Sequence, residues 1–180
     1  MVGAGLVPAR RKLFFEEVAM SLYFHQRKPM RQKDHNYTIG CYFITIDTND
    51  RLPLFGKVVD GKMWMNDAGS MLVTCWDEIC VRFPNIGLDT FIVMPEHIHG
   101  IINMDNPIYS LPDVIQFFKS KTTLHYIKGV RDSRWRGFDS KLWQRNYFER
   151  NIRNASDLAN TRNYIQENPA DYHRFMVEDF

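Results

Sequence analysis

The 180-residue sequence has little of what several classes of protein require. It contains only three cysteines, and their number and scatter do not suit a disulfide framework or a zinc knuckle. Its ten glycines and eight prolines form no low-complexity tract, which excludes collagen-like and disordered chains. The apolar runs fall short of the roughly 20 residues that span a bilayer. We therefore expect a soluble, cytoplasmic protein with reduced thiols and one modest core.

The net charge of +2 is also small, but it is unevenly distributed along the chain. Residues 10–33 contain seven Lys or Arg against two acids, and residues 119–153 contain ten against three. Such asymmetry favours a basic surface that meets an anion, and nucleic acid is the commonest partner of that kind. On charge alone, a basic face that is merely solvated is an equally good interpretation.

Hydrophobic periodicity and turn residues predict the order strand, hairpin, helix, strand, strand, helix, strand, helix. Strands are expected at 37–46, 57–59, 62–65, 88–94, 97–104 and 143–152, with Asp60-Gly61 as a type I′ turn. Helices are expected from Asn66 or Asp67 to Pro84, from Ser110 with Asp113, and from Ser156 or Asp157 to about Glu167, before Asn168-Pro169. We expect residues 1–35 to be a leader, residues 128–143 to be a mobile loop, and residues 36–180 to form one α+β domain, an antiparallel sheet with helices on one face.

Two histidines mark the first candidate site. His97 and His99 flank Ile98 in an alternating segment, so on a strand both imidazoles lie on one face and Ile98 on the other. Two neutral imidazoles can bind one divalent cation if a third ligand comes from elsewhere. Taken alone, the pair is more often structural. The neighbouring Glu96 is either a partner that orients a histidine or an ordinary surface acid.

The final helix supplies the second candidate site. Tyr164 and Asn168 are four residues apart, so they share one helix face. A tyrosine can act as a nucleophile, and an Asn carbonyl oxygen suits Mg²⁺ or Mn²⁺. The alternative is a half-buried aromatic residue and an Asn that ends the helix before proline.

Three segments resemble, in order, the signature of the REP-associated tyrosine transposases, which are relatives of the single-strand transposases of bacterial insertion sequences in the His-hydrophobic-His nuclease superfamily. They are Met94-Pro95-Glu96-His97-Ile98-His99-Gly100-Ile101, the Trp143 segment from Leu142 to Asn154, and Tyr164-Ile165-Gln166-Glu167-Asn168-Pro169. The resemblance extends over roughly residues 36 to 175.

This resemblance implies a ferredoxin-like fold in which His97, His99 and Asn168 bind Mg²⁺ or Mn²⁺ and Tyr164 is the nucleophile. Tyr147 is the rival nucleophile, and we rank it lower because residue 151, four positions on, lies in a predicted strand. The implied reaction is cleavage and strand transfer of single-stranded, hairpin-forming DNA through a 5′-phosphotyrosyl enzyme. The family also implies a bacterial, nucleoid-associated protein, and its members occur as monomers and homodimers.

The basic stretch then becomes a predicted DNA-binding surface. Its cations are Lys119, Lys121, Lys128, Arg131, Arg134, Arg136, Lys141, Arg145, Arg150 and Arg153. Its aromatic residues are Trp135, Phe138, Trp143 and Tyr147, which either stack on bases or belong to the core, with Trp143 the first choice for the core. Two other functions stay open: a catalytically silent, domesticated protein that binds hairpin DNA, and an unrelated hydrolase that uses only the histidine pair.

Overall fold

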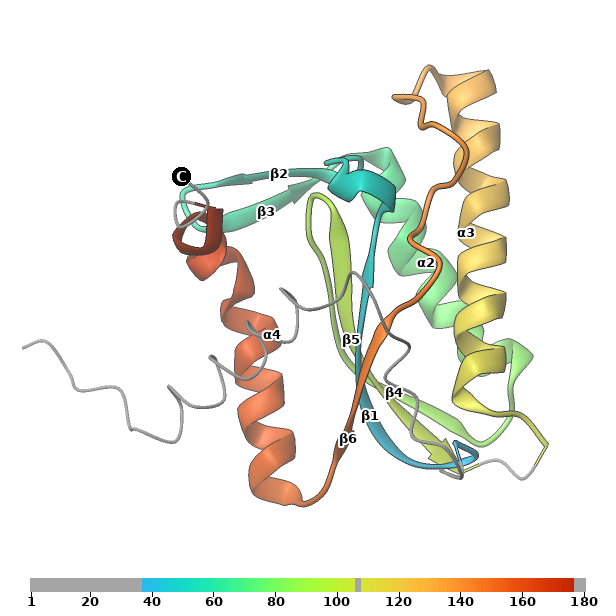
Figure 1. Ribbon diagram of the computed structural model, residues 1–180, viewed down its shortest axis with the longest axis vertical. Helices are drawn as coiled ribbons and strands as arrows, with labels where there is room; N and C mark the ends of the chain where they lie inside the picture. Colours follow the sequence, from blue (N-terminus) through green and yellow to red (C-terminus); the bar gives the residue numbers. More distant parts are fainter. Residues whose placement is uncertain (1–36, 106–107, 177–180) are drawn as a thin grey trace, which may run out of the picture.

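A four-stranded antiparallel sheet lies between two layers of helix in the computed structural model, which describes residues 37–105 and 108–176 (Figure 1). Two helices cover one face of the sheet and the final helix covers the other. The predicted leader, residues 1–35, lies outside the described residues. None of the helices in the described part of the chain is both long and apolar enough to cross a membrane.

The elements follow the predicted order. They are β1 (Ile39–Asp47), the 3-10 helix η1 (Asn49–Arg51), β2 (Gly56–Val59), β3 (Lys62–Met65), α2 (Asp67–Arg82), β4 (Ile86–Val93), β5 (His97–Asp105), α3 (Leu111–Ser133), β6 (Phe148–Ile152) and α4 (Ala155–Met176). The sheet order is β4-β5-β1-β6, and β2 and β3 form a separate hairpin. Elements β1, α2, β4, β5, α3 and β6 thus form a ferredoxin-like βαββαβ unit, as predicted.

Alternation along the two central strands divides the core into two parts. On β1, Tyr42, Ile44 and Ile46 join the cluster under α2 and α3, whereas Phe43 joins the cluster under α4. On β5, Ile98 faces α2 and α3 in the same way. Because side chains alternate with a period of two, the residues on either side of Ile98 must face α4.

The local signals for the hairpin and the first helices are confirmed. Asp60 and Gly61 have φ angles of 50° and 69°, as a type I′ turn requires. The side chain of Asn66 accepts a hydrogen bond from the Gly69 amide and caps α2. Ser110 and Asp113 form a capping box at the start of α3.

The expected loop over residues 128–143 is partly wrong, because α3 continues to Ser133 and ends at Arg134 with a φ angle of 59°. Gly129 lies inside the helix, and a Cβ atom there would lie 2.2 Å from the Trp135 indole. This glycine therefore permits a close approach of an aromatic ring. Glycine inside a helix lowers stability by only about 1 kcal/mol relative to alanine, so the helix can continue through this position.

The bounds of the last strand and helix also differ from the prediction. Strand β6 begins at Phe148, and Trp143 forms an isolated bridge with Thr48. The cap of α4 is Asn154, whose side-chain oxygen accepts a hydrogen bond from the Asp157 amide at 2.9 Å, so the predicted cap at Ser156 or Asp157 is wrong.

Helix α4 does not end at Asn168-Pro169 but runs through Pro169 to Met176. Proline removes one backbone hydrogen bond from a helix, so tertiary contacts must hold the following turns. Ala170 lies 3.3 Å from the position of a Cβ atom on Gly61, at the tip of the β2–β3 hairpin. Tyr172 donates a hydrogen bond to Glu96 at 2.7 Å. These contacts stabilise the last turns of α4, after Pro169, which the sequence pattern did not predict.

Gly100 tests how tightly β5 packs against α2. A Cβ atom on Gly100 would lie 2.5 Å from the ring of Trp76, which also stacks on Phe91. We expect Gly100→Ala to lower the free energy of unfolding by about 2 kcal/mol, because the buried indole must shift. Urea unfolding measures this change. Gly137→Ala, where a Cβ atom meets nothing within 4 Å, is the matched control and should change stability by less than about 0.5 kcal/mol. Equal effects of the two substitutions would contradict the packing argument.

Candidate functional site

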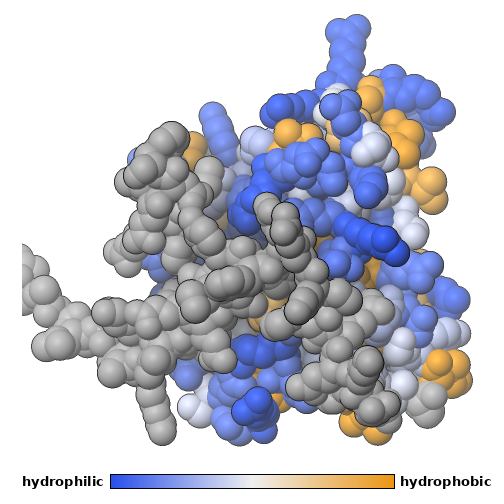
Figure 2. Space-filling view, viewed as in Figure 1, coloured by the Kyte–Doolittle hydropathy of each residue, from blue (hydrophilic) through white to orange (hydrophobic). Residues whose placement is uncertain are grey.

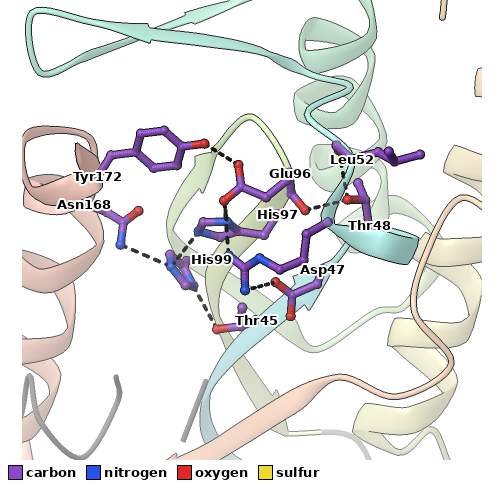
Figure 3. Close-up of polar contacts among 10 residues, drawn as sticks. Thr45, Asp47, Thr48, Leu52, Glu96, His97, His99, Asn168 and Tyr172 are labelled. Atoms are coloured by element: carbon purple, nitrogen blue, oxygen red, sulfur yellow. Dashed lines mark hydrogen bonds and ion pairs between the residues drawn. The ribbon is translucent and has the colours of Figure 1, made fainter. Parts of the chain in front are cut away.

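The two histidines converge on the face of the sheet that α4 covers (Figure 3). Their Nε2 atoms lie 3.1 Å apart, and both side chains are buried. Ile98 points into the opposite core, as the alternation predicts. The pairing of β1 with β5 places His97 opposite Asp47 and His99 opposite Thr45. The two histidines therefore stand on a central strand of the sheet, at the start of β5, rather than on a loop.

His99 is fixed by a buried hydroxyl group. Its Nδ1 atom lies 2.8 Å from Oγ1 of Thr45, and its side chain is fully buried. Burial, followed by the nearby charges of His97 and Arg51, lowers the pKa of His99 well below its usual value. His99 is therefore a neutral imidazole at physiological pH, which is the form that ligates metals.

His97 is fixed by Glu96, which is only 3% exposed and so is not a surface acid. Oxygen Oε1 of Glu96 lies 3.0 Å from Nδ1 of His97 and accepts a hydrogen bond from Arg51 at 3.2 Å. Tyr172 donates to the other oxygen (Figure 3). Burial raises the pKa of Glu96, but the hydrogen bonds and charges of these three partners outweigh burial and lower that pKa to about 2. Because a carboxylate only accepts hydrogen bonds, Nδ1 of His97 carries the proton and its Nε2 atom faces His99.

Helix α4 carries Tyr164, Asn168 and Tyr172 at intervals of four residues, so they share one face. The first two contact His99, and Tyr172 contacts Glu96. The Asn168 amide nitrogen lies 3.3 Å from Nε2 of His99, and the residue is 6% exposed. Rotating this amide by 180° puts its oxygen in nearly the same place. Asn168 is thus a buried side chain of the site, not the helix cap that the alternative interpretation expected.

Tyr164 lies in the small core between α4 and the sheet. Its ring meets Phe43 edge-on at a centroid distance of 5.8 Å and lies 5.4 Å from the His99 ring. The side chain is 3% exposed. Burial raises the pKa of Tyr164 far above its usual value, and a hydrogen bond with Asn168 opposes that shift only in part. The tyrosine is therefore next to the histidines but protonated in this conformation.

Tyr147 does not share this site. It packs against the core under α2 and α3, and the Lys119 ammonium lies 5.5 Å from the centroid of its ring. Its neighbour Phe148 belongs to the cluster under α4. The structure therefore places the rival tyrosine on the face of the sheet opposite the histidines.

Several of the cations predicted to bind DNA have partners inside the protein. Lys119 donates to the carbonyl oxygens of residues 144, 145 and 146 and thereby holds the segment that leads into β6. Lys121 forms an ion pair with Glu78. Arg150 binds Asp157 and Thr161 and fastens β6 to α4. Arg131 pairs with its neighbour Asp132 at the surface.

The other six predicted cations are exposed to solvent. They are Lys128, Arg134, Arg136, Lys141, Arg145 and Arg153. The segment that contains Lys141 and Arg145 runs along the end of β1, where the Gln144 amide donates to the Asp47 carbonyl at 3.0 Å. Figure 2 shows mainly hydrophilic residues on the visible part of this face, with hydrophobic residues in small separate patches.

The aromatic residues of the basic stretch turn inward. Trp143 is 4% exposed and donates from its indole nitrogen to Thr122, which confirms its assignment to the core. Trp135, Phe138 and Tyr147 pack against the same core. Trp64, which is 62% exposed, lies outside the basic stretch and is not among its predicted aromatic residues. Its signal was available, because β3 alternates and Trp64 is out of phase with Met63, which packs on the core.

The donor set has the chemistry of a site for a divalent cation. Two imidazole Nε2 atoms and one amide oxygen are neutral ligands of the kind that Mn²⁺ accepts. Within residues 37–105 and 108–176, no group of three His, Cys, Asp or Glu side chains gathers as a metal site. Asn168, whose side-chain amide lies 3.3 Å from Nε2 of His99, could supply a third donor.

Comparison with known proteins agrees with this geometry. Residues 61–168 match the family model described as "Transposase IS200 like". A protein of Haemophilus influenzae named "Uncharacterized protein" is 33% identical over 160 residues, covering 81% of this chain and 89% of that protein. A second protein of that organism, named "Putative REP-associated tyrosine transposase", is 27% identical over 133 residues, covering 72% of this chain and 70% of its own length.

A solved structure shares the fold. It is titled "Structure of the REP associates tyrosine transposase bound to a REP hairpin", with a TM-score of 0.59, 20% identity, and coverage of 81% of this chain and 74% of its own. The match of more than half the chain to one family, the relatives and the shared fold all agree with the three motifs. The chain therefore belongs to the IS200-like transposase family.

Proposed function

We propose that this protein is a metal-dependent single-strand DNA endonuclease and strand transferase that acts on hairpin-forming DNA through a 5′-phosphotyrosyl intermediate. The observation that carries this proposal is the convergence of His97, His99 and Asn168, with Tyr164 on the same face of α4. The solved structure with the same fold is bound to a REP hairpin, which supports hairpin DNA as the substrate.

His97, His99 and Asn168 fit a divalent cation, Mn²⁺ or Mg²⁺. The two Nε2 atoms face each other at 3.1 Å with their Nδ1 atoms bonded on the far side, to Glu96 and Thr45. This arrangement turns both Nε2 atoms toward one point, where each would offer a lone pair when the ring proton is on Nδ1. Imidazole nitrogen suits Mn²⁺ better than it suits Mg²⁺, so Mn²⁺ is the favoured ion. The bound cation would supply positive charge that offsets the charge on a scissile phosphate.

Tyr164 supplies the nucleophile in this proposal. Its hydroxyl oxygen forms a bond to phosphorus and loses its proton, while the bond from phosphorus to the 3′ oxygen breaks and a free 3′-hydroxyl leaves. A second 3′-hydroxyl can then displace the tyrosine, because the phosphodiester bond energy is kept in the covalent link. Strand transfer therefore needs no nucleotide cofactor.

Access to Tyr164 is the step that the described conformation does not provide. The side chain is 3% exposed, and burial keeps its proton in place. Cleavage therefore requires a rearrangement that uncovers the hydroxyl before a phosphate reaches it. A buried Tyr164 is equally compatible with a catalytically silent protein that only binds hairpin DNA. The adduct assay below therefore distinguishes the nuclease from the silent binding protein.

The first experiment detects the covalent intermediate. Purified protein is incubated with Mn²⁺ and a panel of single-stranded hairpins taken from the DNA that flanks the gene, and adducts are resolved by denaturing electrophoresis. We expect an adduct with the native chain and at least a hundredfold loss with Tyr164→Phe, because the nucleophile is removed. Tyr147→Phe is the matched control and should retain the adduct. Hairpin binding without an adduct on any substrate would instead establish the silent binding protein.

The second experiment separates metal binding from DNA binding. We expect His97→Ala and His99→Ala each to weaken Mn²⁺ binding at least tenfold in calorimetry, because each removes a ligand. Both variants should keep their affinity for hairpin DNA within about threefold, since that affinity rests on exposed cations elsewhere. A loss of DNA affinity equal to the loss of metal affinity would contradict this division of roles.

The third experiment tests Glu96 as the positioning residue of His97. Its folded pKa of about 2 lies below the usual 4.5, so Glu96 stabilises the fold above about pH 5, and that stability is lost as the pH falls toward 2. The free energy of unfolding of the native chain should therefore be roughly 2–3 kcal/mol higher than that of Glu96→Gln at neutral pH, and the two values should converge near pH 2. Urea unfolding at several pH values measures this difference.

A merely structural Glu96 would leave metal affinity unchanged. We expect Glu96→Gln to weaken Mn²⁺ binding about tenfold, because Nδ1 of His97 loses its ionic partner. Asp77→Asn, at an exposed position of α2, is the control for both measurements. An unchanged Mn²⁺ affinity in Glu96→Gln would contradict the proposal that Glu96 positions His97.

A further inference from the structure

The β2–β3 hairpin joins the two elements that carry the candidate site. At its base, the amides of Leu54 and Phe55 donate to the carbonyl of Pro95, at 2.8 and 3.1 Å, two residues before His97. At its tip, Gly61 lies against Ala170, two residues after Asn168. In Figure 1 the hairpin runs from the end of β1 to the last turns of α4, and Figure 3 shows it beside Tyr172 and Glu96.

The two faces of this hairpin differ in character. Val58 is buried and Met63 packs on the core, so their side of the hairpin faces inward. Alternation places four side chains on the other side, and all four are exposed: Lys57, Val59, Lys62 and Trp64. Lys57 lies directly opposite Trp64, and Val59 opposite Lys62. We call these four residues the outer hairpin face.

Trp64 is the unusual member of the outer hairpin face. Its side chain is 62% exposed, whereas Trp76 and Trp143 are 2% and 4% exposed and Trp135 packs on the core. A large aromatic ring left in water forgoes the stabilisation that its burial would give. The exposed indole shares this face with two lysines, and the residues of β2 and β3 include no acid, the nearest in sequence being Asp60 in the turn between them.

This combination has a specific chemical complement. Lysines beside an exposed aromatic ring recur where proteins bind single-stranded nucleic acid, because phosphates meet the cations and an unpaired base stacks on the ring. A duplex hides its bases and offers only phosphates to such a face. An apolar protein partner would have to bury two lysines together with the indole, at a desolvation cost. Charge and stacking together therefore favour a single strand.

We propose that the outer hairpin face binds the single-stranded DNA that enters the active site, with a base stacked on Trp64 and phosphates held by Lys57 and Lys62. This inference rests on the proposed function, because it names how the substrate of that site is held. The base of the hairpin is bonded to Pro95, two residues before His97, and its tip contacts the helix that carries Tyr164, so the hairpin that would hold the strand is joined to both parts of the candidate site. The aromatic residues of the basic stretch, which pack inward, are not available for this role.

The test measures binding separately from cleavage. Affinities for labelled oligo(dT) of about 15 nucleotides and for a duplex of equal length are measured by fluorescence anisotropy, in a Tyr164→Phe background so that no DNA is cut. We expect Trp64→Ala to weaken oligo(dT) binding about tenfold, the loss of one stacked base, and to change duplex binding less than twofold. Trp64→Phe should restore most of the affinity. Val81→Ala, an 85% exposed side chain on α2, is the matched control.

The lysines have their own readout. In the double variant Lys57→Gln, Lys62→Gln, the slope of log affinity against log salt should fall by about 1.4, because two phosphate contacts are lost on a single strand. Binding of oligo(dT) should also quench tryptophan emission in the Trp64 chain and not in Trp64→Phe.

Other outcomes overturn the inference. Equal losses on oligo(dT) and duplex, no loss in Trp64→Ala, or a change in sedimentation that marks a protein interface would each do so. Failure of the proposed function has a different signature, since no adduct would then form although oligo(dT) binding still depends on Trp64. If Trp64→Ala still forms the adduct and binds oligo(dT) with unchanged affinity, the role of the outer hairpin face is contradicted, whereas the proposed enzymatic function stands.

Discussion

The pairing of β1 with β5 is the constraint on which the candidate site depends. Its register places Thr45 opposite His99, and Oγ1 of Thr45 lies 2.8 Å from Nδ1 of His99. A shift of one residue would turn both histidines into the core under α2 and α3 and bring Ile98 to the other face. The apolar requirement of the core therefore also fixes the direction of the two imidazoles.

Helix α4 completes the site from the opposite side, and ionic contacts hold it there. Arg150 ties β6 to Asp157 and Thr161 near the start of the helix, and Arg162 pairs with Asp89 on β4. These contacts, with the packing of Tyr164 on Phe43, fix the helix before any substrate is present. The same docking that brings Asn168 to His99 also buries the phenol, so the arrangement that brings the proposed ligands together also covers the proposed nucleophile.

Local signals in the sequence predicted the parts of the fold that local physics decides. The type I′ turn at Asp60-Gly61 and the cap at Asn66 depend on a few neighbouring residues, and the alternation around Ile98 depends only on strand geometry. The end of α4 could not be predicted in this way. Pro169 is a helix breaker by propensity, and it is tolerated because Tyr172 and Ala170 find partners on segments far away in the sequence.

The site was predictable to different degrees for a related reason. His97, His99, Tyr164 and Asn168 stand in motifs, whereas the role of Glu96 depends on burial and on Arg51, 45 residues earlier in the chain. Charge counting also did not distinguish the predicted DNA-binding cations that have partners inside the protein. Lys119, with its three backbone carbonyl partners, looks the same in sequence as an exposed lysine. Only tertiary contacts distinguish a cation that fastens the fold from one that faces solvent.

The neutrality of the proposed ligands has a consequence for the chemistry. Two imidazoles and an amide would leave the full charge of a divalent cation uncompensated by protein ligands, so the electrostatic attraction for a phosphate would be at its largest. Glu96 lies one residue from His97, but its carboxylate accepts hydrogen bonds from Nδ1 of His97, from Arg51 and from Tyr172, and does not face Nε2. In the proposed site, the carboxylate would thus orient a ligand without joining the ligand set. Such a site would favour an anionic substrate over water, as the proposed phosphodiester nuclease needs.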